Sequence, residues 1–339
     1  MCIRYACLFF SFVTAVMPLD SSSQSTADNP HGWLLVANKG DSSLGIVNSA
    51  EEQQVAEIPE GGVTGHEVTS SPDGKTAYVP IYGNSGVGKP GTDGKNMVVI
   101  DLGSRKVTGN VEWSHGVRPH CPVFGPTDGL LYVTTELDKT ISIIDPHSLQ
   151  IVGTIPTGQP ESHMLAISHD GTRGYTANVG PGTVSVLDMQ GRKTLKVIHI
   201  SGETQRISIT PDDSMVFTAD QKQPRLAVID TKTDTVKTWI ALPGLGYGTA
   251  STSDGRWLVV CVPTVNKVSV VDLKTLKVVH NIDVPKAPQE VLIRPGNETA
   301  YVSCDASHKV ATINTADWTV SKLIDAGKGT DGLAWAAGQ

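Results

Sequence analysis

The sequence lacks the features that mark several large classes of protein. Its 339 residues carry a formal net charge of −7, so there is no basic excess of the kind that non-specific binding to nucleic acid or to an anionic membrane requires. No two of its five cysteines form a Cys-x-x-Cys pair, which excludes zinc-ribbon, thioredoxin-like and haem-attachment motifs. Beyond the first residues, no apolar run is long enough to cross a bilayer.

The one marked apolar run lies at the N-terminus and has the form of a secretory leader. Arg4 is followed by an apolar stretch over residues 5–17, and then by a polar linker over residues 20–28 with a small-x-small pattern at Ser25 and Ala27. We expect residues 1–27 to be a signal peptide with its linker and the protein to be periplasmic or secreted. If translation starts at Met17 instead, the protein is cytoplasmic.

What the sequence does contain is a repeat of about 42 residues. Turn tetrapeptides, most of them containing Asp-Gly, begin at intervals of 42 residues, at Pro126, Ser168, Thr210, Thr252 and Arg294. A further copy begins at Ser71, which is one period plus a 13-residue insertion before Pro126. A second element, a strand that ends in Asp or Asn, ends at Asn48, Asp101, Asp145, Asp188, Asp230, Asp272 and Asn314. We interpret these aspartates as turn formers, because Asp side chains bond nearby backbone amides.

Each period holds four short alternating apolar runs, the pattern of half-buried strands. Four-stranded antiparallel units at this period are propeller blades. The chain starts mid-repeat with a second strand at Trp33 and stops mid-repeat with a first strand at Asp331, so both ends can combine into one blade. The sequence therefore predicts an all-β, seven-bladed β-propeller over residues 28–339, with six whole blades and one composite blade.

Several second strands carry a shared signature, in the runs Ala77-Tyr-Val-Pro, Leu131-Tyr-Val-Thr-Thr, Gly174-Tyr-Thr-Ala-Asn and Ala300-Tyr-Val-Ser. With the Pro-Asp-Gly turns before them, they resemble the Tyr-Val-Thr-Asn (YVTN) repeat family of β-propellers, from Trp33 to Trp335. The resemblance implies exported or surface-layer proteins, with lactonase-like and haem-d1-type propellers as neighbours. It implies the fold more strongly than any one function.

The starts of the first strands should ring the mouth of the central channel. In the 42-residue register these positions are His66, Cys121, His163, Gln205, Tyr247, Gln289 and Asp331, with Glu67, His120, Glu161, Arg206 and Glu290 beside them. His66, His120 and His163 fall on three consecutive blades. They could hold a divalent transition metal, with Glu67 or Glu161 as a further ligand or base. The alternative is that these histidines bond only to loops or to water.

A second set of channel residues suggests acid–base chemistry. Arg118, Arg206, Glu67 and Glu290, with Tyr247, could polarise and protonate a lactone or carboxylate ligand. Lactonase-like propellers use His, Glu and Arg in such a channel, although no specific motif matches residue by residue. Arg206 could instead point between blades.

The insertion, residues 83–96, separates a second from a third strand and should lie on the same face as the histidines. It is either a lid over the mouth or a plain surface loop. Its run from Gly83 to Lys89 nearly spells a phosphate-binding loop, but Pro90 replaces the required Ser or Thr and no helix follows. Cys261 and Cys304 lie in apolar runs and are expected to be buried free thiols.

These observations leave two functions open. The first is an exported, monomeric scaffold that binds a small molecule or protein at the channel face. The second is an enzyme, either a lactonase-like hydrolase or a metal-dependent lyase that uses the channel histidines. The sequence does not identify a cofactor or a substrate.

Overall fold

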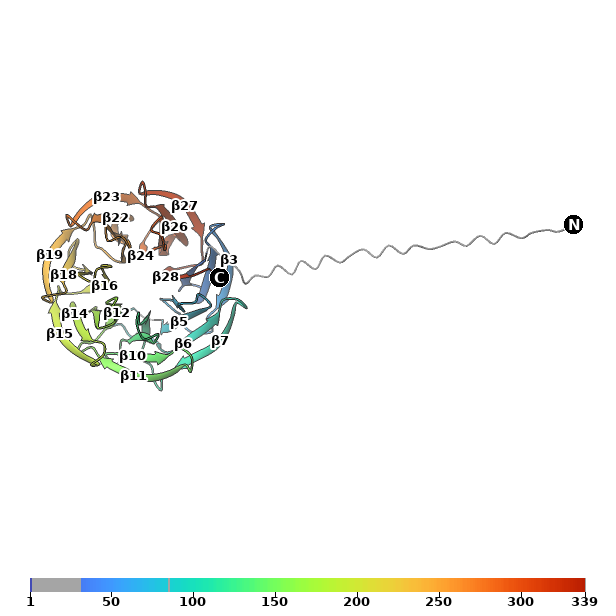
Figure 1. The fold of residues 1–339 in the computed structure, drawn as a ribbon, viewed down its shortest axis with the longest axis horizontal. Helices are drawn as coiled ribbons and strands as arrows, with labels where there is room; N and C mark the ends of the chain where they lie inside the picture. The colour runs from blue at the N-terminus through green and yellow to red at the C-terminus, as the bar shows by residue number, and fades with distance from the viewer. Residues whose placement is uncertain (2–31, 85, 339) are drawn as a thin grey trace.

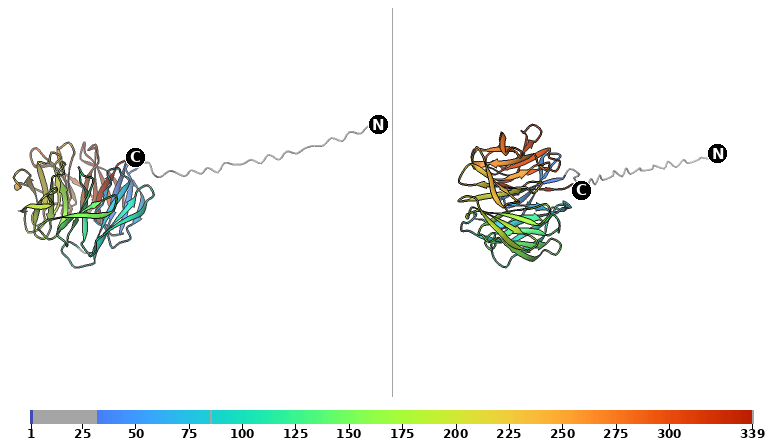
Figure 2. Two further views of the ribbon diagram at one scale, coloured as in Figure 1. Left: turned by 60° about the horizontal axis from the view of Figure 1, so that its bottom comes forward. Right: turned by 60° about the vertical axis from the view of Figure 1, so that its left-hand side comes forward.

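The computed structural model describes residues 32–84 and 86–338, together with Met1. Within these residues the strands form seven four-stranded antiparallel sheets arranged as blades around a central channel (Figure 1). The tilted views in Figure 2 show the strands running between two faces, with loops gathered on each. This confirms the predicted seven-bladed all-β propeller. The leader expected over residues 1–27 lies outside the described residues.

The blades are numbered here by position in the chain. Blade 1 is composite and contains β28 (Thr330–Ala336), β1 (Trp33–Asn38), β2 (Ser43–Asn48) and β3 (Gln53–Pro59). Blade 2 contains β4 (Thr69–Ser70), β5 (Thr76–Gly83), β6 (Asp93–Asp101) and β7 (Lys106–Glu112). Blade 3 contains β8 (Pro119–Phe124), β9 (Leu131–Thr135), β10 (Thr140–Asp145) and β11 (Gln150–Pro156).

Blade 4 contains β12 (Ser162–Ile167), β13 (Arg173–Asn178), β14 (Thr183–Asp188) and β15 (Lys193–His199). Blade 5 contains β16 (Thr204–Ile209), β17 (Met215–Asp220), β18 (Arg225–Asp230) and β19 (Thr235–Ala241). Blade 6 contains β20 (Thr249–Ser251), β21 (Trp257–Val262), β22 (Lys267–Asp272) and β23 (Lys277–Asp283), with the short helix η1 (Pro263–Val265). Blade 7 contains β24 (Pro288–Ile293), β25 (Thr299–Cys304), β26 (Lys309–Asn314) and β27 (Thr319–Asp325), with η2 (Asp305–Ser307).

The composite blade closes the ring as the sequence predicts. β1 pairs with β2 on one side and with β28, from the other end of the chain, on the other. The indole of Trp335 in β28 also stacks on Tyr301 of blade 7, with ring centroids 6.3 Å apart. Closure therefore pairs both sides of β1, which would otherwise be the open edge of a linear array.

The repeated polar residues form the turns on the face away from the insertion. Asp101, Asp188 and Asp272 each accept a hydrogen bond from a backbone amide two or three residues further on. The Asp-Gly turns add a second motif, in which a Ser or Thr hydroxyl donates to the Asp carboxylate, as Ser168 donates to Asp170 at 2.6 Å. The aspartates are therefore turn formers, as expected.

The hydrophobic core lies between neighbouring blades. Second and third strands are buried almost throughout, whereas the outer strands are mostly exposed or half-buried, with one buried residue near the end of each. Of the described cysteines, Cys121, Cys261 and Cys304 are all buried and free, and burial raises the pKa of the Cys304 thiol to about 12. The interpretation of Cys261 and Cys304 as buried free thiols is confirmed.

Two sets of β-bulges recur around the ring. In every blade the register between the third and fourth strands shifts by one residue. In five blades the register between the first and second strands also shifts, close to the channel mouth. Bulges at the outer strands bend the exposed sheet edges, and bulges at the inner strands re-aim side chains.

The insertion extends a hairpin of blade 2. β5 and β6 remain paired as far as Gly83 and Asp93, so the irregular part of the insertion spans residues 84–92. Among the described residues, no helix is long and apolar enough to cross a membrane.

Candidate channel site

Two rings of residues face the channel mouth. The first comes from the starts of the inner strands, where the bulges lie. The second comes from the residue that follows the second strand of a blade, namely Lys39, Glu136 and Asp305, and from Tyr82 at the equivalent position inside the longer strand β5. Both positions lie on one face, because a four-stranded meander places its 4–1 and 2–3 connections at the same end. That face also carries the insertion.

Blades 2–4 contribute an aromatic group that we call the histidine cluster, formed by His66, Tyr82, His120 and His163. The imidazoles of His120 and His163 lie face to face, with centroids 3.6 Å apart and planes tilted by 30°. His66 meets the edge of His120 at 5.7 Å and lies against Tyr82 at 4.8 Å. The three histidines predicted on consecutive blades therefore come together in the structure.

The histidine cluster is electrically neutral. Burial lowers the pKa of His66 to about 4, with Asp331 opposing the shift. Burial, reinforced by the neighbouring imidazoles, holds the pKa of His120 well below its usual range, and burial beside Arg206 does the same for His163. Neutral imidazoles have one nitrogen that donates and one that accepts a hydrogen bond. Among the described residues, the Nδ1 atoms of His120 and His163 have no hydrogen-bond partner.

Glu136 links the cluster to the insertion. Its carboxylate accepts a short hydrogen bond from the Tyr82 hydroxyl and lies 3.2 Å from Nη1 of Arg118. Arg118 also bonds Asp93 through Nε at 2.7 Å and the Lys89 carbonyl through Nη2 at 2.6 Å. The Gly88 amide donates to Glu136 at 3.3 Å. Arg118 and Glu136 therefore fix the insertion beside the channel mouth.

Blades 1, 2, 5 and 7 contribute a second group, which we call the ion-pair network. Arg206 extends from the bulge of β16, where its φ is 57°, and crosses the channel. Its Nη1 contacts a carboxylate oxygen of Glu67 and lies 3.1 Å from Glu290, and its Nη2 lies 2.8 Å from Asp331. Asp331 then pairs with Lys39 at 3.2 Å, and Lys39 with Asp305 at 2.9 Å.

The carboxylates of this network differ in acidity. Burial raises the pKa of Glu67 well above its usual range and also raises that of Glu290, although Arg206 acts against both shifts. Burial acts in the same direction on Asp331, but Lys39 and Arg206 outweigh it and lower its pKa. The guanidinium carbon of Arg206 lies over the ring of Tyr247, 5.0 Å from the ring centroid. The network thus holds a salt-bridged Asp331 beside two carboxyls that retain a proton more readily.

The histidine rings do not converge on a common point. Two of the three imidazoles are stacked, which directs their nitrogens along nearly parallel planes. Across residues 32–84 and 86–338, no group of three His, Cys, Asp or Glu side chains is arranged so that it could hold a metal ion. A metal bound by His66, His120 and His163 would require at least one stacked ring to rotate, and this site stays a prediction.

The structure separates the residues proposed from the sequence into these two groups. His66, His120 and His163 lie in the histidine cluster, Glu67, Arg206, Tyr247 and Glu290 lie in the ion-pair network, and Arg118 anchors the insertion. Arg206 points into the channel and not between blades. Cys121 directs its thiol at the Leu165 carbonyl of the next blade, while His120, one residue earlier, faces the channel. Glu161 accepts a hydrogen bond from the Gly180 amide, outside both groups.

Sequence reasoning missed Tyr82, Glu136, Lys39 and Asp305. All four follow the last residue of a second strand or fall at the equivalent position of the extended β5 hairpin. Their shared register was visible in the repeat, since Lys39 and Asp305 each follow the last residue of such a strand. The prediction used only the starts of the first strands, and these positions do not include the second ring.

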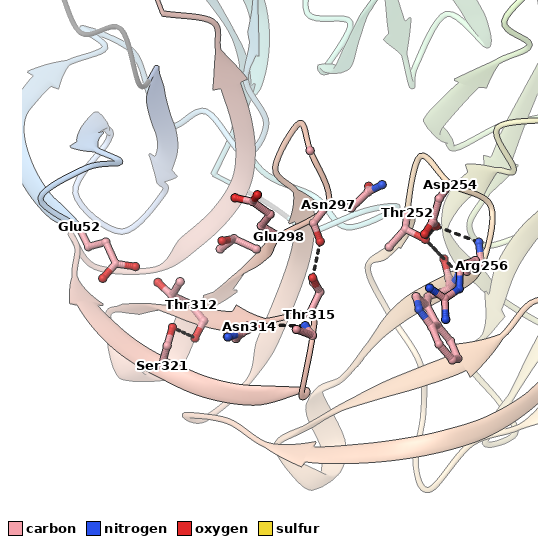
Figure 3. A pocket seen from close by; sticks show the side chains of 14 residues that line it. Glu52, Thr252, Asp254, Arg256, Asn297, Glu298, Thr312, Asn314, Thr315 and Ser321 are labelled. Carbon is pink, nitrogen blue, oxygen red and sulfur yellow. Dashed lines mark hydrogen bonds between the residues drawn. The ribbon is translucent and has the colours of Figure 1, made fainter.

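A cavity lies on the opposite face, between blades 6 and 7. It measures about 600 Å³ and is lined by strand-connecting turns that include Asp254, Asn297 and Thr315 (Figure 3). Several of these polar groups are already paired, because Thr315 donates to the Asn297 carbonyl and Asn297 bonds Ser253 at 2.8 Å. The cavity is thus separate from the channel residues.

The fold and the channel can now be compared with known proteins. The family described as "Lactonase, 7-bladed beta-propeller" matches residues 27–238, more than half of the chain. The chain belongs to this family. The family match covers the histidine cluster and Arg206, but not Glu290 or Asp331.

Among curated proteins, the chain is similar to the uncharacterized protein YncE of Salmonella typhi and of Salmonella typhimurium. The identity is 25% over 217 residues, which are 62% of this chain and 60% of YncE, so the match spans less than two thirds of that relative. This relationship agrees with the resemblance to YVTN-type propellers.

Solved structures share the fold at lower identity. Hydrazine synthase of Kuenenia stuttgartiensis aligns over 89% of this chain and 99% of that chain, with a TM-score of 0.71 and 18% identity. A functionally unknown protein of Desulfotomaculum acetoxidans aligns over 91% of this chain and all of that chain, with a TM-score of 0.75 and 14% identity. At these identities the similarity establishes the fold alone.

Proposed function

We propose that this lactonase-family propeller is exported and binds a small, oxygen-rich, uncharged molecule at the channel mouth on blades 2–4. The proposal rests on one observation above all, the unpartnered Nδ1 atoms of His120 and His163. Both residues are nearly inaccessible to solvent, at 2% and 4% exposure. A buried polar atom without a partner costs about 1–3 kcal/mol, which a ligand hydroxyl or carbonyl would recover.

The surroundings favour an uncharged ligand. The two arginines nearest the cluster are already engaged, because Arg118 contacts Asp93 and Glu136 and Arg206 contacts three carboxylates. Of their nitrogens, only Nε of Arg206 has no hydrogen-bond partner among the described residues, so neither guanidinium offers a ligand carboxylate a pair of free nitrogens. Neutral imidazoles and the unpartnered Oε1 of Gln205 offer hydrogen bonds without net charge.

The insertion forms one side of a pocket. A pocket of about 310 Å³ lies between Lys89 and Pro90 of the insertion and the loop from Glu136 to Lys139, with Arg118 and Glu161 also on its walls. Its size suits a small molecule, since ligand pockets begin at about 300 Å³. The anchoring of Lys89 by Arg118 gives the pocket a fixed wall.

A thermal-shift screen of the full chain against small lactones and sugars, followed by calorimetry, tests the proposal. We expect a compound from this set to bind, and its affinity to fall at least about tenfold in a His120→Leu/His163→Leu variant. His147→Ala is the matched control, since His147 is exposed on the opposite face, where its backbone amide bonds Asp145. Binding that survives the double substitution, or a screen without a single binder, would refute the proposal.

Hydrolysis of such a lactone is the second candidate function, and the family match favours it. Catalysis needs one group that accepts and one that donates a proton, with pKa values shifted in opposite directions. A neutral histidine, His66 or His163, would be the base, and Glu67 or Glu290 the proton donor. The Nδ1 of His163 lies 3.8 Å from Glu136, which could orient the ring as hydrolysis begins.

Proton release during incubation with a lactone panel measures this activity. We expect His163→Ala to lower the rate about 100-fold and Glu298→Gln, on the opposite face, to leave it unchanged. Equal rates in His163→Ala and the parent chain would eliminate the hydrolase.

A metal-dependent lyase remains a proposal on the same histidines. Elemental mass spectrometry of the full chain, after reconstitution with zinc, copper, iron and manganese, measures the metal content. Near-stoichiometric metal that disappears in His66→Ala/His163→Ala supports this proposal, and a metal-free parent chain eliminates it.

A further inference from the structure

Two loops at the channel face bring three groups into line, Ser114 and His115 from the connection between blades 2 and 3 and Asp138 from the connection between β9 and β10. The hydroxyl of Ser114 lies 3.2 Å from Nδ1 of His115, and Nε2 of His115 lies 2.8 Å from Oδ1 of Asp138. Neither the histidine cluster nor the ion-pair network includes any of them. This is the chain of nucleophile, base and carboxylate that acyl-transfer enzymes use on unrelated folds.

The carboxylate determines which nitrogen of His115 carries the proton. Ionised Asp138 only accepts hydrogen bonds, so Nε2 is the donor and, in the neutral ring, Nδ1 has the free lone pair. That lone pair faces Ser114 and is placed to take the hydroxyl proton. The roles of the two ring nitrogens are exchanged relative to the usual serine-protease arrangement, but each role is filled.

Backbone hydrogen bonds hold this loop on both sides. Ahead of the serine, the Trp113 amide donates to the Lys95 carbonyl at 2.8 Å and its indole donates to the Ser142 hydroxyl at 3.0 Å. After the histidine, the Val117 and Arg118 amides both donate to the Gly94 carbonyl at 2.9 Å. A catalytic group needs such a rigid support if it is to keep its geometry.

Gly116 lets the loop approach the insertion closely. A Cβ at this position would lie 2.6 Å from Cβ of Asp93, so a larger residue would push the loop away. The Gly116 amide makes no hydrogen bond to any described residue, so it is available to a ligand oxygen. Backbone amides of this kind stabilise the oxyanion that forms during acyl transfer.

The carboxylate comes from an adjacent loop that is bonded to the first. The Leu137 amide donates to the Val117 carbonyl at 3.2 Å, which fixes Asp138 relative to His115. Leu137 and Lys139, on either side of Asp138, both line the 310 Å³ pocket under the insertion. Asp138 therefore lies between two residues of the pocket wall.

We propose that Ser114, His115 and Asp138 form an acyl-transfer site for open-chain carboxylic esters at the rim of the channel face. His115 removes the Ser114 proton as Oγ bonds to the ester carbonyl carbon, and the C–O bond to the alcohol breaks as His115 returns the proton to the alcohol oxygen. Water then attacks the acyl-serine with the same base, releasing the acid and restoring the serine. Asp138 touches no reacting atom and acts as a positioning residue.

The solvent exposure of His115 and Asp138 determines how much catalytic activity we expect. The His115 side chain is 59% exposed and that of Asp138 34%, so water weakens the interaction between them. We therefore expect slow turnover of activated esters. The same exposure makes these residues replaceable without loss of the fold.

The full chain would be treated with a fluorophosphonate probe, with peptide mass spectrometry to locate the label, and assayed with 4-nitrophenyl acetate. We expect the label on Ser114, no label in Ser114→Ala, and labelling about 100-fold slower in His115→Ala. Ser148→Ala is the matched control, because Ser148 is an exposed serine that donates to Asp145 and has no histidine partner. It should label like the parent chain.

A separate measurement is needed to show that Asp138 positions His115 and does not merely support the fold. Asp138→Asn should slow labelling, because an amide can donate to Nε2 and favour the wrong tautomer, and Asp138→Glu should recover part of the rate. A parent chain that carries no label on Ser114, or equal ester hydrolysis in Ser114→Ala, would overturn the proposal. Equal rates in Asp138→Asn and the parent chain would remove Asp138 from it.

Discussion

Arg206 contacts three carboxylates, an unusual number for a single side chain. It is 4% exposed, and its carboxylate partners Glu67 and Asp331 are 5% and 7% exposed. Taking such charges out of water is costly, and their mutual attraction offsets this cost only while every partner is present. The network therefore defines the channel geometry more than it adds net stability.

Removing the guanidinium should be strongly destabilising. In Arg206→Met, three carboxylates lose their shared cation inside the protein, and we expect the free energy of unfolding to fall by about 3–5 kcal/mol. Urea denaturation at neutral pH measures the change. Arg256→Met is the control, since Arg256 is exposed and lies over Trp257 without an ion pair among the described residues, and it should change stability by under about 1 kcal/mol. A loss below 1 kcal/mol in Arg206→Met would contradict this account.

The neutral histidines predict a pH dependence. Unfolded histidines take up protons near pH 6.5, whereas burial keeps His120 and His163 neutral to much lower pH. The unfolded state thus binds more protons, so this contribution to stability is complete above about pH 6.5 and is lost progressively as the pH falls below that value. The slope is at most about 1.4 kcal/mol per pH unit for each histidine.

Urea midpoints at pH 7 and pH 5 test this dependence. The difference between the two midpoints should shrink in His120→Phe/His163→Phe and stay unchanged in His147→Ala. Glu67 and Glu290 have raised pKa values and give a slope of opposite sign, but they are present in every variant and cancel in the comparison. A double variant with the same pH dependence as the parent chain would show that the histidines are not buried as neutral groups.

At the scale of the strand, the inner bulges and close strand contacts shape the channel. Gly248, at the start of the first strand of blade 6, donates its amide to the Gln289 carbonyl of blade 7 at 3.0 Å. A Cβ at this position would lie 2.3 Å from that carbonyl oxygen. Blades 6 and 7 can therefore meet at the channel only because this residue has no side chain.

Gly248→Ala should separate these two blades. We expect it to lower the free energy of unfolding by about 2 kcal/mol, since backbone must move to admit the methyl group. Calorimetric melting temperatures of the variant and of Gly103→Ala provide the comparison. Gly103 lies in a turn where a new Cβ would meet its nearest atom at 3.6 Å, so that control should change little. Equal melting temperatures would contradict the close contact.

The sequence predicted the elements well and the bulges poorly. Alternating apolar residues and Asp-containing turns are local signals, so each blade could be located from its own repeat. A bulge depends on how two strands pair, and it moves the channel position by one residue, which is why His120 and not Cys121 faces His163. Ser114, His115 and Asp138 meet through the contact of two loops, which no repeat position encodes.

At the scale of the whole molecule, the composite blade should control cooperativity. A chain that ends at residue 327 lacks β28 and with it Asp331, Trp335 and the partner of β1. We expect this chain to lose its single cooperative unfolding transition and to associate through the open edge of β1. Light scattering after gel filtration, beside thermal unfolding, measures both effects. A monomeric truncated chain that melts like the parent would contradict the role of closure.

The channel residues show why a site on a propeller is only partly readable. The repeat placed the histidines on consecutive blades, and the ring geometry brought them together as expected. Tyr82 and Glu136 were not predicted, because their contact joins two neighbouring blades and no single repeat contains it. The carboxylates around Arg206 likewise come from three different blades.

The pairing of β1 with β28 also sets the order of events during synthesis. The first strand to be made has to wait for the last before its sheet is complete, while blades 2–7 can form one after another from contiguous sequence. The longest-range contacts are thus formed last, which slows the final folding step and delays a closed ring until the whole chain is available. The same adjacency of the two ends makes the ring a good candidate for circular permutation, with new termini placed between any two blades.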